Sequence, residues 1–284
     1  MMPGKLIICP TPIGNLDDMP PRALEALRAA DAVCAEDTRV TGKLLAAFGI
    51  RQKLERLDEN LMGERAASIV ERIRAGETLA YCSDAGMPGV SDPGQRLVDA
   101  ALDAGVAVEV LPGPTAVATA YVASGFTCPR FYFGGFFPRK AGERAQALQL
   151  VAGLDAVALF YESPHRITSA LADIAAALPG RRVAVCRELT KLHEEVVRGL
   201  AGELAAEFAA REDAGGVKGE IVLAIDAPSE QEHEQAREDA AASAADRAAE
   251  LVAAGELSRK DIVKALRAEF GISRNEAYDL VHAL

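Results

Sequence analysis

Short apolar runs alternate with amphipathic segments through the first part of the chain. The apolar runs, each typical of a buried strand, cover residues 6–9, 32–35, 78–82 and 106–111. The segments with helical spacing of their apolar residues cover 21–30, 42–48, 64–75 and 94–104. This alternation is typical of a parallel sheet covered by helices. We therefore predict an N-terminal α/β domain over residues 1–118.

The pattern changes in the next part of the chain, where strand candidates follow one another more closely. They cover residues 131–136, 157–161, 183–186, 195–197 and 221–225, with helices expected at 144–151, 166–177 and 201–210. The short separation of 183–186 from 195–197 favours an antiparallel pair. Residues 119–226 are therefore predicted to form a second α/β domain with a mixed sheet. A helix over 115–124 could belong to either domain.

The last part of the chain is acidic and alanine-rich before it becomes amphipathic. Residues 227–245 are interpreted as a linker that runs into an alanine-rich helix, and residues 246–284 as a small helix–turn–helix appendage. Ser258 with Asp261, and Ser273 with Glu276, have the spacing of helix capping boxes. The basic residues within 256–284 could meet phosphate, but five acids in the same stretch balance them, so packing or a dimer contact is the alternative.

Composition is that of a globular chain of 284 residues with 50% apolar content. The longest apolar runs fall short of the roughly 20 residues that a membrane helix needs, and residues 1–5 lack the apolar core of a signal peptide. We therefore expect a cytoplasmic protein without a membrane partner. Five widely separated cysteines are expected to be buried thiols, and the four histidines show no metal-ligand spacing, so no metal is expected. A net charge of −11 argues against indiscriminate nucleic-acid binding but leaves room for a local basic site.

Three loops rich in glycine and proline follow three of the predicted strands. They are Pro10-Thr-Pro-Ile-Gly-Asn15, the stretch from Ser83 to Gly94, and Leu111-Pro-Gly-Pro-Thr115. Open α/β sheets bind ligands beyond the carboxyl ends of their strands, so the three loops predict one shared pocket. The glycine-rich fingerprints of NAD-binding and P-loop proteins are absent from the sequence. A backbone-lined pocket with few fixed cations suits a nucleoside with a positive or zwitterionic tail, and S-adenosylmethionine fits that description.

Eight collinear motifs give the chain a family resemblance over roughly residues 5–226. Besides the first and third loops they are Ala35-Glu-Asp-Thr-Arg39 with Thr41-Gly-Lys-Leu-Leu45, Ser83-Asp-Ala-Gly-Met-Pro88 with Ser91-Asp-Pro-Gly94, Gly134-Gly-Phe-Phe-Pro-Arg-Lys140, Phe160-Tyr-Glu-Ser-Pro-His-Arg166, Arg187-Glu-Leu-Thr-Lys-Leu-His-Glu194 and Lys218-Gly-Glu-Ile-Val222. Together they resemble the ribosomal RNA small subunit methyltransferase I family, a branch of the tetrapyrrole methylase superfamily.

The resemblance implies a fold, a cofactor and a reaction. The fold is a two-domain tetrapyrrole-methylase-like α/β fold with a parallel-sheet N-terminal domain, a mixed-sheet second domain and a small helical C-terminal appendage. By the resemblance, S-adenosylmethionine is expected to bind between the two domains, and the protein is expected to form a homodimer. The expected substrate is small ribosomal subunit (16S) rRNA, methylated at the ribose 2′-oxygen of a cytidine in the decoding region.

Two alternatives stay open at this point. A corrin or porphyrin precursor C-methyltransferase shares the superfamily fold and cofactor, although its first loop usually reads Gly-x-Gly-Pro-Gly-Asp, which Pro10-Thr-Pro-Ile-Gly-Asn15 does not. The other alternative is a non-catalytic RNA-binding or ribosome-binding module that uses the C-terminal helices.

Methyl transfer from a sulfonium requires alignment of oxygen, methyl carbon and sulfur rather than a metal. The predicted cofactor contacts are Pro12, Ile13, Gly14, Ser83, Asp84, Gly86, Met87, Thr115, Ala116, Tyr161, Glu162, Lys218, Gly219 and Glu220. The candidates for substrate activation are Asp37, Arg39, Glu188 and Lys191, with domain-bridging ion pairs as the alternative. Arg139, Lys140, Arg166 and Arg187 are the expected phosphate contacts. Lys191 could either accept a proton in a desolvated cleft or stay charged and hold a phosphate.

Overall fold

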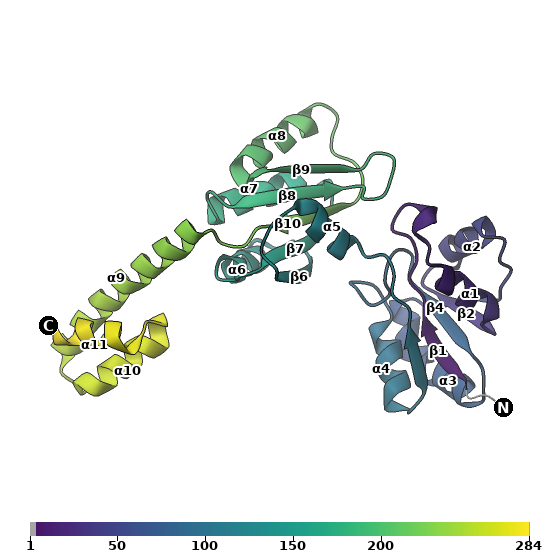
Figure 1. The fold of residues 1–284 in the computed structure, drawn as a ribbon, viewed down its shortest axis with the longest axis horizontal. Coiled ribbons are helices and arrows are strands. Elements are labelled where there is room, and N and C mark those ends of the chain that lie inside the picture. Colours follow the sequence, from purple (N-terminus) through teal and green to yellow (C-terminus); the bar gives the residue numbers. More distant parts are fainter. Residues whose placement is uncertain (1–3, 284) are drawn as a thin grey trace. The chain divides into compact units, whose positions relative to one another are not determined.

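The computed structural model describes residues 4–283 and divides the chain into two compact units. The first unit extends to Ala227 and the second begins at Pro228. The first unit contains two five-stranded sheets (Figure 1). The predicted division of this unit at residue 118 remains a prediction.

The first sheet is parallel throughout, as the alternating pattern predicts. Its strands run in the order β3-β2-β4-β1-β5 and all four neighbouring pairs are parallel. The strands are β1 (Lys5–Ile8), β2 (Ala32–Ala35), β3 (Leu54–Arg56), β4 (Leu79–Cys82) and β5 (Ala107–Val110). The sequence pattern did not indicate β3, because this three-residue edge strand contains a single apolar residue, Leu54.

Two pairs of helices cover the two faces of this sheet. They are α1 (Pro21–Ala29) and α2 (Thr38–Ala47) on one face, and α3 (Glu59–Arg74) and α4 (Gln95–Asp103) on the other; a short 3-10 turn, η1, spans Leu16–Asp18. Helices α2 and α3 begin four and five residues before the expected starts at 42 and 64. The reason is capping, since the side chains of Asp37 and Asp58 accept hydrogen bonds from the amides of Arg39 and Leu61.

The second sheet is mixed, in the order β6-β7-β10-β8-β9. Its strands are β6 (Phe131–Phe136), β7 (Val157–Glu162), β8 (Arg182–Arg187), β9 (Glu195–Leu200) and β10 (Ile221–Ile225). Strands β6 and β7 are parallel and the other pairs are antiparallel. The predicted antiparallel pairing of residues 183–186 with 195–197 is confirmed.

Helices again cover both faces of the second sheet. One face carries α6 (Ala141–Ala152), α7 (Ile167–Ala177) and α8 (Ala201–Asp213), and the other face carries α5 (Ala116–Ser124). Val117 and Ala120 of α5 are buried against Ala184 and Cys186 of β8. Helix α5 therefore packs with the second sheet.

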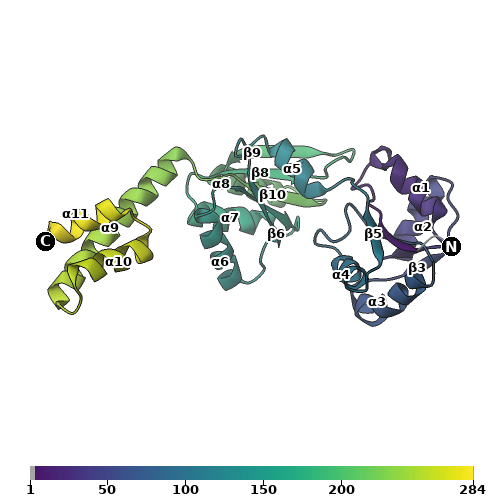
Figure 2. The same ribbon diagram turned by 60° about the horizontal axis from the view of Figure 1, so that its bottom comes forward.

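The second unit consists of α9 (Glu230–Ala254), α10 (Arg259–Phe270) and α11 (Arg274–His282). Helix α9 begins within the segment expected as a linker, because Ser229 and Glu232 form a capping box that starts the helix there. Ser258 and Ser273 cap α10 and α11, as their spacing predicts. Figure 2 shows α10 and α11 beside the same stretch of α9. Ala244 and Ala248 of α9 and Leu266 of α10 lie in the buried core of this unit.

Of the five cysteines, Cys9, Cys34, Cys82 and Cys186 are buried and Cys128 is partly buried, all as free thiols. Within residues 4–283, no helix combines the length and hydropathy needed to cross a bilayer.

Candidate functional site

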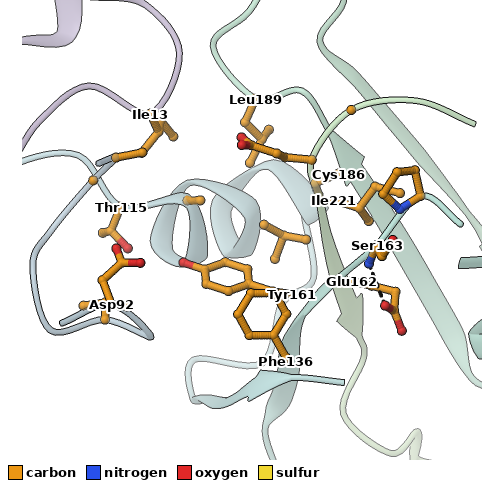
Figure 3. Close-up of a pocket in the computed structure, with 18 of the residues that line it drawn as sticks. Ile13, Asp92, Thr115, Phe136, Tyr161, Glu162, Ser163, Cys186, Leu189 and Ile221 are labelled. Carbon is orange, nitrogen blue, oxygen red and sulfur yellow. Dashed lines mark hydrogen bonds between the residues drawn. The ribbon is translucent and has the colours of Figure 1, made fainter. Parts of the chain in front are cut away.

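A cavity of about 360 Å³ lies among the loops at the ends of strands from both sheets of the first unit (Figure 3). From the first sheet, the loops after β1, β4 and β5 supply Ile13, Ala85, Gly86, Met87, Val90, Asp92, Thr115 and Ala116. From the second sheet come Phe136, Arg139, Tyr161, Glu162, Ser163, Pro164, Arg166, Cys186, Leu189, Gly219, Glu220, Ile221 and Val222. The three glycine- and proline-rich loops thus share one cavity, and its volume lies within the roughly 300–1,000 Å³ typical of ligand pockets.

Backbone contacts shape the part of the wall that the first sheet supplies. The amide of Thr11 donates to the carbonyl of Gly86 at 2.9 Å, and the amide of Gly86 donates back to Thr11 at 3.1 Å. This bridge fixes the loop after β1 against the loop after β4. Gly86 has φ +79°, and a Cβ added there would lie 3.2 Å from Cγ2 of Ile13. The backbone angle therefore favours glycine, and a Cβ would in addition press on the Ile13 side chain.

Aromatic rings form the middle of the wall that the second sheet supplies (Figure 3). The ring of Tyr161 packs edge-to-face on Phe136 and Phe133, with centroid distances of 5.4 and 5.1 Å. Burial raises the pKa of Tyr161 to about 12, and the charges of Asp92 and Glu220 add to the shift. The Tyr161 hydroxyl is therefore a neutral hydrogen-bonding group at physiological pH.

Asp92 brings a carboxylate into the cavity wall, and the sequence analysis did not select it. Burial raises the pKa of Asp92 to about 6, with a further contribution from the carboxylates of Glu36 and Asp84. Its motif Ser91-Asp-Pro-Gly94 is one of those that carry the family resemblance, but Asp92 was not among the predicted site residues. The sequence feature that could have identified Asp92 is its position as an acid in the glycine- and proline-rich loop between β4 and α4.

Glu162 and Arg166 form an ion pair in the wall of the cavity. The Glu162 side chain is buried and accepts a hydrogen bond from the amide of Ser163 at 2.6 Å, drawn in Figure 3. Burial raises the pKa of Glu162 despite the neighbouring guanidinium. Arg166, expected to contact a phosphate, is therefore held inside the cavity wall instead of projecting from an open surface.

The cavity wall contains only part of the predicted site. Of the predicted residues it includes Ile13, Gly86, Met87, Thr115, Ala116, Arg139, Tyr161, Glu162, Arg166, Gly219 and Glu220. The predicted contacts that lie outside it are Pro12, Gly14, Ser83, Asp84 and Lys218. The lining residues that the sequence analysis did not select are Ala85, Val90, Asp92, Phe136, Ser163, Pro164, Cys186, Leu189, Ile221 and Val222.

Lys191 lies beside the cavity in a network of charges. Its Nζ contacts Oε1 of Glu188 at 2.8 Å and Oε2 of Glu220 at 2.9 Å. Partial burial disfavours the ammonium, but the two carboxylates outweigh it and raise the pKa of Lys191. A Cβ at Gly14 would lie 2.5 Å from Cγ of Lys191, so the loop after β1 contacts this side chain closely. The network favours a charged role for Lys191 over the proton-accepting role.

Asp37 and Arg39 form a local pair at the start of α2. The guanidinium and amide of Arg39 both donate to Asp37, and these hydrogen bonds hold the pKa of Asp37 well below its usual range. The Asp37 amide donates to Oδ1 of Asp84 at 3.0 Å, which links the loops after β2 and β4. Asp37 therefore has a structural task as a helix cap, while Arg39 keeps a side chain that is 85% exposed.

Lys140 and Arg187 lie outside the cavity wall. Lys140 is exposed and pairs with Glu143 at 2.9 Å, whereas Arg187 pairs with Glu195 at 3.0 Å. Glu195 is shared with Arg211 at 2.9 Å, so Arg187 belongs to a network of the second sheet. Across the described part of the chain, no group of three or more His, Cys, Asp or Glu side chains has the arrangement of a metal site.

Comparison with known proteins connects this geometry to a family. The sequence profile of a family described as Tetrapyrrole (Corrin/Porphyrin) Methylases matches residues 5–205. A ribosomal RNA small subunit methyltransferase I from Halalkalibacterium halodurans is 38% identical over 279 residues, which cover 98% of this chain and 95% of that relative. The chain belongs to the ribosomal RNA small subunit methyltransferase I family.

A second relative and a solved structure are also similar to this chain. The relative of the same name from Escherichia coli O157:H7 is 43% identical over 230 residues, covering 81% of this chain and 80% of the relative. A crystal structure of uroporphyrin-III C-methyltransferase from Thermus thermophilus, complexed with S-adenyl homocysteine, matches with a TM-score of 0.54 and 18% identity. That match covers 78% of this chain and 97% of that structure and shows a shared fold.

Gly86 offers a direct test of the cavity. Gly86→Ala adds a Cβ at a positive φ and against Ile13, so it should weaken binding of S-adenosylhomocysteine by about tenfold or more in isothermal titration calorimetry. The matched control is Gly105→Ala, because Gly105 has φ +68° with no atom near a Cβ and lies outside the cavity wall.

Both substitutions should lower the thermal unfolding midpoint to a similar extent, because both place alanine in the left-handed region. Only Gly86→Ala should alter binding. Equal affinities in the two folded variants would remove the loop after β4 from the cofactor site.

Proposed function

We propose that this chain transfers a methyl group from S-adenosylmethionine to the ribose 2′-oxygen of a cytidine in the decoding region of small-subunit rRNA. The observation that carries the proposal is the similarity along nearly the whole chain to relatives named ribosomal RNA small subunit methyltransferase I. The position of the nucleotide and the 2′-oxygen come from the family resemblance of the motifs.

The residues of the cavity fit the cofactor. Loops with exposed backbone groups suit the nucleoside part, as in other sites at the carboxyl ends of strands. The carboxylate of Asp92 and the rings of Tyr161 and Phe136 suit a positive charge. When bound, S-adenosylmethionine supplies an activated methyl group on a sulfonium centre. The site therefore needs residues that orient the reactants and exclude water more than residues that polarise them.

Orientation in the site depends on rigid walls. The bridge between Thr11 and Gly86 fixes one wall, and the packed rings of Phe136 and Tyr161 fix the other. The Lys191 ammonium pairs with Glu188 and Glu220, and Glu220 is part of the cavity wall. In this proposal Lys191 stays protonated and positions the RNA through a phosphate or ribose oxygen, while Glu188 and Glu220 orient the ammonium.

Contacts to the rRNA phosphates are assigned to cations with exposed or cavity-facing side chains. Arg39 and Lys140 are 85% and 80% exposed, and Arg139 lines the cavity. Arg187 contributes less in this proposal, because it is committed to Glu195. The net charge of −11 means that RNA binding rests on this local set of cations and not on the overall field.

A homodimer and a cytoplasmic location complete the proposal. Apolar side chains are exposed on the edge strands of both sheets, namely Val110 on β5, and Phe131 and Tyr132 on β6. Such residues on unpaired edges support a contact between two copies of the chain. The location follows from the proposed substrate, because ribosomal subunits are cytoplasmic.

The two alternatives have weaker support. A corrin or porphyrin C-methyltransferase shares the fold at 18% identity, whereas the rRNA methyltransferase relatives are 38% and 43% identical. A non-catalytic ribosome-binding module would have no use for a cavity with these walls.

A substrate comparison tests the proposed reaction. With methyl-labelled cofactor, label should enter rRNA in small ribosomal subunits that lack the modification, and nucleoside analysis should recover 2′-O-methylcytidine. Free rRNA and a tetrapyrrole precursor serve as parallel substrates. Label in the tetrapyrrole alone would replace the proposal with the C-methyltransferase alternative.

Lys191 variants separate the two roles considered for this residue. Lys191→Ala should lower the rate on small subunits by about tenfold or more with cofactor affinity retained, because a charged hydrogen-bond donor to the substrate is lost. Lys191→Arg keeps the charge and should recover part of the rate. Lys53→Ala, which removes a surface pair with Glu55, is the matched control.

Rates are measured under single-turnover conditions with saturating cofactor. If Lys191→Arg is as inactive as Lys191→Ala, the charged role is wrong and a proton-accepting role takes its place. Wild-type rates in both variants would exclude both roles.

A further inference from the structure

Asp92 lies on one side of the cavity, facing an aromatic wall. Figure 3 shows its carboxylate beside Thr115, with the hydroxyl end of the Tyr161 ring on the same side of the cavity. Phe136 stacks edge-to-face on that ring. An acid and two aromatic rings therefore share one part of the cavity.

Nothing among residues 4–283 pairs the Asp92 carboxylate with a cation. The carboxylates of Glu36 after β2 and Asp84 after β4 raise the pKa of Asp92, and the Ser83 side chain lowers it. The charge of Asp92 in turn raises the pKa of Tyr81 and Tyr161. Glu162, which pairs with Arg166, lies on the opposite side of the cavity in Figure 3. A partly buried carboxylate among other acids is costly in the empty protein, and a cation in the cavity would offset that cost.

The aromatic rings indicate which kind of cationic ligand would suit the cavity. Rings attract cations through their negative faces, and onium groups carrying carbon substituents gain most because they are weakly hydrated. A carboxylate alone would suit any ammonium, whereas a carboxylate near the aromatic side chains of Tyr161 and Phe136 suits a sulfonium with its methyl and methylene groups.

We propose that Asp92 is the counter-charge for the sulfonium of S-adenosylmethionine and sets the preference of the site for this cofactor over its neutral product, S-adenosylhomocysteine. This inference rests on the proposed function, since it assumes that the cavity holds the cofactor. Methyl transfer turns the sulfonium into an uncharged thioether, so Asp92 loses its partner at that moment. The same carboxylate that favours binding of the cofactor therefore favours release of the product.

The test compares the two ligands in calorimetric titrations of the full chain. Asp92→Asn should weaken S-adenosylmethionine binding by about tenfold or more and S-adenosylhomocysteine binding by less than about threefold, as expected for loss of a charged partner of the sulfonium alone. Asp99→Asn is the matched control, because Asp99 is an exposed carboxylate on α4 outside this cavity. It should change neither affinity.

The pH dependence gives a second readout that needs no variant. Because the pKa of Asp92 is raised to about 6, lowering the pH through that value protonates the empty protein's carboxylate. The affinity of the wild-type protein for S-adenosylmethionine should therefore fall on acidification more steeply than its affinity for S-adenosylhomocysteine. In Asp92→Asn the two profiles should run parallel.

Stability gives a third readout. A folded-state pKa above the unfolded value means that the ionised carboxylate destabilises the empty protein above pH 6 and that this cost disappears as the pH falls. Asp92→Asn without ligand should therefore raise the thermal unfolding midpoint at neutral pH, even though it weakens cofactor binding.

The outcomes distinguish this inference from the proposed function. Equal losses for the two ligands in Asp92→Asn, or parallel pH profiles in the wild-type protein, would overturn the inference and assign Asp92 to a group that both ligands share, such as the ribose or the amino group. Failure of the wild-type protein to bind either ligand would overturn the proposed function and this inference with it.

Discussion

The site depends on the two backbone hydrogen bonds that join Thr11 to Gly86. They connect the loop after β1 to the loop after β4, although Thr11 and Gly86 are 75 positions apart in the sequence. Because backbone groups make the contact, the loops approach closely and leave no bulky side chain between them. Glycine at position 86 permits both the positive φ and the contact with Ile13. The cavity wall is therefore set by backbone geometry that few other residues could adopt.

Charge is distributed differently inside and beside the cavity. Beside it, Lys191 is balanced by Glu188 and Glu220, and the three charges hold the loop after β8 in place. Inside it, the pKa of Asp92 is raised by burial and by the neighbouring carboxylates. A balanced network suits a positioning task, whereas an unbalanced carboxylate suits a cationic ligand. This difference supports our proposal that the Lys191 network serves the RNA and that Asp92 serves the cofactor.

Sequence patterns predicted the sheets better than the helix starts. Buried strands such as β2 and β10 are continuous apolar runs, so residues 32–35 and 221–225 were predicted with the bounds that the structure has. Helices α2 and α3 begin earlier than their apolar periodicity does, because the capping residues Asp37 and Asp58 lie in polar stretches. The edge strand β3 pairs with a single neighbour and needs little apolar sequence.

Within the site, the sequence identified the loops but not every side chain that faces the cavity. Glycine and proline mark the turns, so Gly86 and Thr115 were found, while Asp92 was hidden in a motif that also reads as a turn. The partnership of Arg166 with Glu162 depends on how α7 starts after β7, a geometry that the spacing of the two residues does not specify. The electrostatic influence of Asp92 on Tyr161 joins residues of two different sheets and has no local sequence pattern.

Hydrogen exchange with and without S-adenosylhomocysteine tests the central claim, that loops from both sheets enclose one cofactor site. We expect the ligand to slow amide exchange together in three regions, residues 83–94, residues 112–117 and residues 219–222, while α10 and α11 exchange as before. Protection confined to one sheet, or protection located away from these loops, would contradict it.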